Sequence, residues 1–146
     1  MVFNLSTLLA TYLDNLNLAP QAGGLGMTVI LGFPDVGRPE APPFPLGALK
    51  FEEDNFLTVP KRVTRLGTVP PLGTTVRVNL YLFAASEMEL LGLVDRLRAV
   101  RERVAVLDSE GMAFALAYAP TKRETFDQTN PNLRYVTSTA ITLSLI

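Results

Sequence analysis

The densest run of carboxylates in the sequence is Glu52-Glu53-Asp54, the first place to look for acid–base chemistry or a metal site. Neighbouring side chains of a strand point to opposite faces, so only Glu52 and Asp54 would converge there. No D-x-D-x-D-G pattern surrounds them, as a calcium loop would require. We therefore expect this run to lie in a solvated loop or at a subunit contact, without a catalytic or metal-binding role.

Composition excludes most other catalytic machinery. The 146 residues include no Cys and no His. Disulfides, thiolate nucleophiles, Cys/His zinc sites and Ser-His-Asp triads therefore cannot form. We expect a protein that is not an enzyme and that carries neither a cofactor nor a metal ion.

Glycines and basic residues could instead hold phosphate groups. The run Gly23-Gly24-Leu25-Gly26 precedes a predicted strand and lacks the G-x-x-x-x-G-K-[ST] pattern, so it is predicted to be a turn. Lys61-Arg62 and Lys122-Arg123 are short basic clusters near prolines or acids, which favours solvated loops. The net charge of −1 gives no overall field that would attract nucleic acid.

Four arginines are candidates for a polar face or for the wall of a channel that carries DNA. Arg96 and Arg103 lie on a predicted helix, where basic residues near the end also complement the helix dipole. Arg77 and Arg134 are predicted on strands whose other face is apolar, so they would lie on a polar outer surface of the sheet. The sequence leaves non-specific contact with DNA open.

Two amphipathic helices are predicted, over residues 5–16 and 87–103, because apolar residues recur there at helical spacing. The second begins with a capping box, in which the Ser86 hydroxyl caps the helix and Glu89 reaches back to the Ser86 amide. Strands are predicted over residues 25–31, 74–83, 104–107, 112–119 and 133–146, with an irregular one over 47–59 and a polar loop over 120–131. The apolar window 78–94 is interrupted by polar residues, so no membrane span is expected.

This order of elements predicts one α+β domain over residues 1–146. We expect a mostly antiparallel mixed sheet with the two amphipathic helices packed on one face. Residues 34–45 hold five prolines and should form an extended arm or loop without internal hydrogen bonds.

Several features indicate self-association. Charged residues make up 18% of the chain, apolar residues 48%, and the mean hydropathy is +0.25, so much apolar surface must be covered. The Pro-rich arm has few apolar residues and suits a segment that lies on a neighbouring subunit. The last strand lacks charged or proline residues at its end, so it could pair with another chain if it lies at a sheet edge. The resulting subunit-interface candidates are Phe33, Pro42, Phe44, Leu46, Ile141, Leu143 and Leu145.

The chain resembles the tail terminator and tail-completion proteins of tailed bacteriophages. The resemblance lies in the order of elements and in three segments: residues 75–83 (TVRVNLYLF), the capped helix 87–103, and residues 134–143 (RYVTSTAITL). It implies a homohexameric ring, without catalytic activity, that caps the tail tube, ends tube polymerisation and offers a surface to the neck or connector protein. DNA would pass through the lumen, and the protein would belong to the neck region of the virion tail after assembly in the host cytoplasm.

Two alternatives stay open. One is another neck or baseplate component of the virion with a similar fold. The other is a small ligand-binding or enzymatic α+β domain that uses Tyr81, Tyr135 and the carboxylates, which would require a concave polar pocket.

Overall fold

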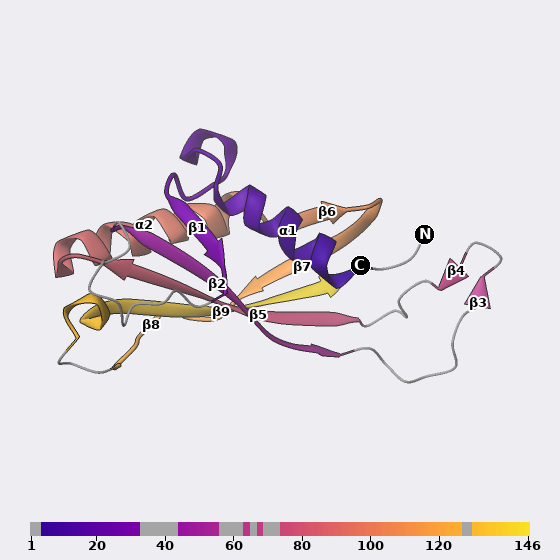
Figure 1. Ribbon diagram of the computed structural model, residues 1–146. Coiled ribbons are helices and arrows are strands. Elements are labelled where there is room, and N and C mark those ends of the chain that lie inside the picture. Colours follow the sequence, from indigo (N-terminus) through magenta and orange to yellow (C-terminus); the bar gives the residue numbers. More distant parts are fainter. Residues whose placement is uncertain (1–3, 33–43, 56–62, 65–66, 69–73, 127–129) are drawn as a thin grey trace.

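The structure is a computed structural model, and it describes residues 4–32, 44–55, 63–64, 67–68, 74–126 and 130–146. Two helices lie on one face of a curled mixed sheet (Figure 1). The predicted α+β class is confirmed. The predicted arm over residues 34–45 lies outside the described residues except for Phe44 and Pro45.

The main sheet has seven strands, and most of them pair antiparallel. From one edge to the other they are β1 (Thr28–Leu31), β2 (Leu46–Asn55), β5 (Thr75–Ala84), β9 (Tyr135–Leu145), β7 (Met112–Tyr118) and β6 (Val106–Ser109). The short strand β8 (Lys122–Arg123) pairs with the first half of β9. Strands β1 and β2 pair in parallel, and β3 (Val63–Thr64) pairs with β4 (Gly67–Thr68) outside the main sheet.

The two helices have the predicted bounds, α1 (Leu5–Leu16) and α2 (Glu87–Arg103). The Ser86 hydroxyl caps α2 by accepting from the Glu89 amide at 3.2 Å. The other half of the predicted capping box is wrong. With Ser86 in an extended conformation, the amide that faces the Glu89 carboxylate is that of Ala85, at 2.9 Å.

The core lies between the helices and the sheet. The predicted alternation on β5 is confirmed, since Val76, Val78, Leu80 and Leu82 are all 0% exposed. Four side chains from each helix complete this cluster: Leu8, Leu9, Tyr12 and Leu16 from α1, and Leu90, Leu93, Leu97 and Val100 from α2. No helix in the described part of the chain combines the length and the apolar character needed to cross a membrane.

The last strand is internal. β9 pairs with β5 along one side and with β7 and β8 along the other, so it does not offer a free edge. It also begins at Tyr135 rather than at residue 133, because residues Pro131–Leu133 form the short 3-10 helix η2. The sequence could not place this strand, because strand neighbours are set by contacts far apart in the chain.

Strand β2 is more regular than its acidic residues predicted, and residues 56–59 of the predicted strand 47–59 lie outside the described residues. It pairs with β5 over its whole length, with one bulge between Phe51 and Glu53. Strand β8 was missed inside the predicted loop 120–131. The predicted hairpin is confirmed, although its turn is tighter than expected. Glu110 and Gly111 alone form it, both with positive φ (50° and 77°).

The edge of the sheet at β1 is closed by a side chain. The Asn17 amide donates from Nδ2 to the Val29 carbonyl oxygen and accepts from the Val29 N–H at Oδ1, both at 2.9 Å. These contacts replace the backbone bonds that a further strand would make at Val29. Helix α1 also contacts β6 at the other edge, as the curl of the sheet allows.

Candidate functional site

The face of the sheet opposite the helices is divided into a covered half and an open half. The covered half is a small apolar cluster in which Leu46, Ala48, Phe83 and Val136 are buried, with Ile30, Phe44, Tyr81, Phe126 and Leu133 packed against it. The open half, formed by the first part of β5, the end of β9 and strand β7, presents small or polar side chains. By strand register these are Thr75, Arg77, Asn79, Ala113, Ala115, Ala117, Ala140, Thr142 and Ser144, all exposed or half-buried.

The open half carries compensated charges along β2 and β5. Arg77 lies there, on the polar outer surface that the sequence predicts, and pairs with Glu53 at 3.0 Å. Glu52 accepts from the Asn79 amide at 2.8 Å and lies 3.7 Å from Lys50. Because these groups are solvent-exposed, the pairs contribute little to stability.

The acidic run is split by the bulge. The sequence predicted that Glu52 and Asp54 would converge, which is wrong, because the bulge turns both Glu52 and Glu53 toward the open half. Asp54 is opposite Val76 in the register, so it lies on the helix side of the sheet together with Phe51, which is opposite Val78. No three acidic side chains within the described residues are placed to hold a metal ion.

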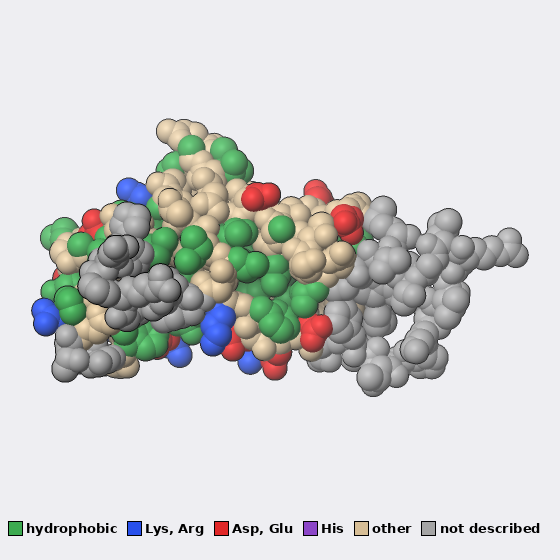
Figure 2. Space-filling model, in the orientation of Figure 1, with side chains coloured by type: hydrophobic (Ala, Val, Ile, Leu, Met, Phe, Trp, Pro, Cys, Tyr) green, Lys and Arg blue, Asp and Glu red, His purple; other side chains and the backbone are tan. Residues whose placement is uncertain are grey.

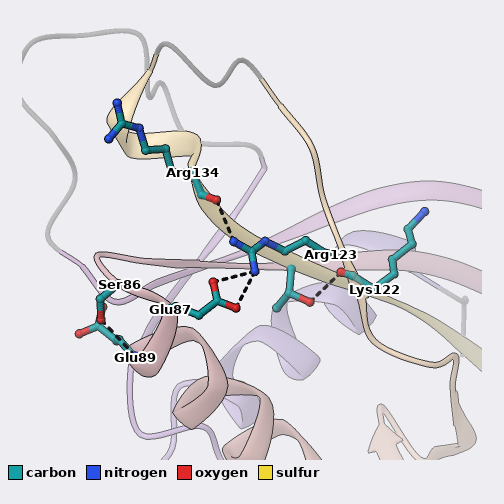
Figure 3. A network of polar contacts seen from close by, with 7 residues as sticks. Ser86, Glu87, Glu89, Lys122, Arg123 and Arg134 are labelled. Carbon is teal, nitrogen blue, oxygen red and sulfur yellow. Dashed lines mark hydrogen bonds and ion pairs between the residues drawn. The ribbon is translucent and has the colours of Figure 1, made fainter.

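Arg134 does not lie on the sheet surface. It follows η2 in a helical conformation, one residue before β9, so the predicted place on a strand face is wrong. Its backbone oxygen accepts from Arg123 Nη2 at 3.2 Å, while its side chain points away from this contact (Figure 3).

Arg123 belongs to a polar network that joins β8 to the start of α2 (Figure 3). Its Nη1 donates to both carboxylate oxygens of Glu87 at 2.8 Å, and its guanidinium lies 5.8 Å from the centre of the Tyr135 ring. The Thr137 hydroxyl donates to the Lys122 carbonyl at 2.7 Å. The predicted solvated loop at Lys122-Arg123 is therefore an ordered part of the sheet.

A second, partly buried network lies under α2 and was missed from the sequence. Arg101 Nη2 donates to the Ala119 carbonyl oxygen and to the hydroxyls of Thr121 and Thr139, at 3.3 and 3.2 Å for the two hydroxyls. Its guanidinium also lies 5.7 Å from the centre of the Tyr118 ring. These contacts hold the irregular turn between β7 and β8 against the helix.

The Tyr118 hydroxyl lies 3.3 Å from that of Tyr12, which extends the Arg101 network to α1. Burial raises the pKa of Tyr12 well above its ordinary value, and it raises the pKa of Tyr118 as well. Both phenols are therefore neutral at physiological pH, and the pair is a structural contact between α1 and β7.

Arg96 and Arg103 are brought together at an open groove in the helical layer. Two helical turns apart on α2, they line it together with the exposed Ala99. The other wall is the turn around η1 (Pro20–Ala22), and Arg103 Nη1 donates to the Pro20 carbonyl oxygen. The remaining lining residues are Gly23, Gly24 and Val100.

The glycines allow the η1 turn to approach the helices. Gly23 has a φ of +92°, which favours glycine. A Cβ atom at Gly24 would lie 2.0 Å from the carbonyl oxygen of Leu18. The predicted turn role of this glycine run is confirmed, and the groove that it forms is lined mostly by carbon atoms.

The predicted interface residues have different places in the fold. Phe33 and Pro42 lie outside the described residues. Ile141 and Leu143 are 0% exposed in the main core, and Leu46 is buried in the covered half of the sheet. Since these three side chains pack inside their own subunit, the reason for assigning them to a subunit interface is removed. Phe44 and Leu145 are half-buried.

Other large apolar side chains, outside the predicted interface set, are exposed. They are Leu18, Leu31, Phe51, Met88, Leu91, Val106 and Ile146. Figure 2, in the orientation of Figure 1, shows hydrophobic side chains gathered over the centre of the face in view, with acidic side chains beside them. Met88, at 77% exposed, and Leu91 could have been found from the sequence, because they fall off the apolar stripe of α2.

Comparison with known proteins shows the fold alone. No protein-family model matches the sequence, and no curated protein matches it. The chain is similar in structure to a chain in the virion of a native gene transfer agent (GTA) particle, with a TM-score of 0.54 and 11% sequence identity. The similarity covers 96% of this chain and 95% of the other, so it extends over nearly the full length of both.

Proposed function

We propose that this chain is a structural component of a phage-like virion, in which it forms a homohexameric ring that caps the tail tube. The observation that carries the proposal is the fold shared over 96% of the chain with a chain of a gene transfer agent virion. The resemblance of residues 75–83, 87–103 and 134–143 to tail terminator proteins gives the finer assignment.

The surface supports a role in assembly. Six exposed large apolar side chains lie outside the core: Met88 and Leu91 on α2, Leu31 and Val106 on the outer strands β1 and β6, Phe51 on β2, and Leu18 just beyond α1. Such side chains are available for contact with other chains. The described part of the chain brings together no catalytic set, and burial keeps the phenols of Tyr12 and the half-buried Tyr118 neutral.

In this function the ring ends tube polymerisation by covering the last ring of tube subunits. Each subunit uses one surface to hold its neighbour, which closes the cycle. One face of the ring then binds the tail tube protein and the other the neck or connector protein, with DNA passing through the lumen. The protein would thus be located in the neck region of the virion and assemble in the host cytoplasm.

The proposal is tested by the native mass of the purified protein at several concentrations, followed by negative-stain imaging. A ring of six subunits supports the terminator function. A monomer at every concentration, both alone and with purified tail tubes, contradicts the hexameric cap and favours the ligand-binding alternative.

A further inference from the structure

The groove between α2 and the η1 turn carries positive charge on an apolar lining. Arg96 is exposed and makes no hydrogen bond or ion pair within the described residues, while Arg103 is held by the Pro20 carbonyl. Between them lie the exposed Ala99 and the buried Val100. An occupant would therefore combine an apolar group with a carboxylate or phosphate.

The second half of β2 carries negative charge beside an exposed apolar side chain. Phe51 is 40% exposed, and Asp54 is exposed on the same side of the sheet. Glu52 and Glu53 are compensated by neighbouring cations, whereas Asp54 has no ion pair within the described residues. An aromatic ring and an unpaired carboxylate thus stand together on one side of this strand, which we name the Phe51/Asp54 edge.

This strand is also open laterally. The ladder between β1 and β2 ends at the pair Leu31 and Leu49, so β2 has no partner on that side over Lys50–Asn55 among the described residues. Pairing with the β6 edge of another copy is disfavoured, because β6 carries Asp108 and would place like charges together. We therefore expect β2 to contact another copy through its side chains and not through backbone pairing of strands.

We infer that the Phe51/Asp54 edge of one copy docks in the Arg96/Arg103 groove of a second copy. The two surfaces have complementary charge and matching apolar parts, and they lie in separate layers of the molecule, sheet and helix (Figure 1). A contact between two different surfaces of one chain is heterologous, the type that generates rings. The inference rests on the proposed ring and names the interface that closes it.

The absence of cysteine from the sequence allows a direct test by disulfide trapping. The variant Asp54→Cys/Ala99→Cys is oxidised at ring-forming concentration and separated on a denaturing gel without reductant. The expected result is a ladder of covalent species that ends at six subunits. Each single variant should stop at two, because it offers one thiol per chain. The matched control, Asp54→Cys/Met88→Cys, places its second thiol on α2 about 16 Å along the helix from residue 99 and should give no ladder.

The outcomes separate this inference from the proposed function. A six-subunit mass without a ladder from the Asp54→Cys/Ala99→Cys variant overturns the inferred contact and leaves the ring in place. A protein that stays monomeric without a ladder, both alone and with purified tail tubes, overturns both. A ladder that continues far beyond six supports the contact and contradicts the closed hexamer.

A charge exchange gives an independent readout. Asp54→Arg and Arg96→Glu should each raise the concentration needed for half-assembly by about tenfold or more, and the double variant should restore it to within about threefold of the original protein. Urea unfolding of each variant shows that the subunit is folded. Unchanged assembly of both single variants overturns the inference. Unchanged assembly together with weaker binding of short duplex DNA by Arg96→Glu assigns the groove to nucleic acid instead.

Discussion

The helix side of the sheet and its open half are formed by the same strands. The residues that face the helices are apolar and buried, and those on the open half are small or polar and at least partly exposed. On the helix side, β5 and β9 present Val76, Leu80 and Ile141, all 0% exposed. On the open half, the same strands present Arg77 and Thr142, one exposed and one half-buried. The alternation of a strand therefore separates two tasks: one face holds the subunit together, and the other is left for contact or for water.

The largest loss of stability is expected from shortening a buried side chain on the helix side of the sheet. Leu80→Ala removes a fully buried side chain from the core between the helices and the sheet and should lower the free energy of unfolding by about 3 kcal/mol. The matched change on the open half, Thr142→Ala, should alter it by less than about 0.5 kcal/mol. Urea unfolding measures both. Equal losses would show that the two faces are not divided in this way.

The same comparison holds for two arginines. Arg101→Met breaks the partly buried contacts to Ala119, Thr121 and Thr139, and should cost about 2 kcal/mol of unfolding free energy. Arg77→Met removes only an exposed ion pair with Glu53 and should cost less than about 1 kcal/mol. Thermal or urea denaturation measures both losses of unfolding free energy. A larger loss for Arg77→Met than for Arg101→Met would contradict the comparison.

Buried phenols make the helix side sensitive to high pH. Because burial raises the pKa of Tyr12 and Tyr118 in the folded state, stability should be constant below the unfolded value near 10.0 and fall as the pH rises above it. Tyr12→Phe cannot ionise at this site and should weaken the fall. A pH series of urea unfolding between neutral pH and strong base measures this, and parallel curves for the two proteins would refute it.

A smaller loss of stability is expected from removing the cap at the N-terminus of α2. Ser86→Ala removes the hydroxyl that accepts from the Glu89 amide and should lower stability by about 1 kcal/mol. Ser86→Asp keeps an acceptor at the cap and should stay within about 0.5 kcal/mol of the original protein. Loss of stability by Ser86→Asp as large as that of Ser86→Ala would argue against the cap.

Local patterns predicted most of the elements. The bounds of both helices and the alternation of β5 follow from apolar spacing and from the Ser86 cap, which are properties of neighbouring residues. The internal place of β9, the bulge after Phe51 and the contacts of Arg101 depend on pairings between distant parts of the chain. The sequence could therefore predict the elements of the fold, but not which arginines and carboxylates they bring together.

The groove and the Phe51/Asp54 edge illustrate the same limit. Residue types and spacing predict a loop or a subunit contact for the acidic run, and a polar face for Arg96 and Arg103. They do not predict the exposure of Phe51, which follows from the short extent of β1 beside β2. Only the fold shows that Glu52 and Glu53 are paired with cations, while Asp54 has no ion pair within the described residues.

The most direct test of the account is the native mass of Phe51→Thr beside the original protein, with urea unfolding of both. Threonine suits a strand and leaves the helix-side core untouched, so the free energy of unfolding should stay within about 1 kcal/mol. The account predicts a six-subunit ring for the original protein and a folded monomer for the variant at the same concentration. Equal masses for the two folded proteins would contradict it.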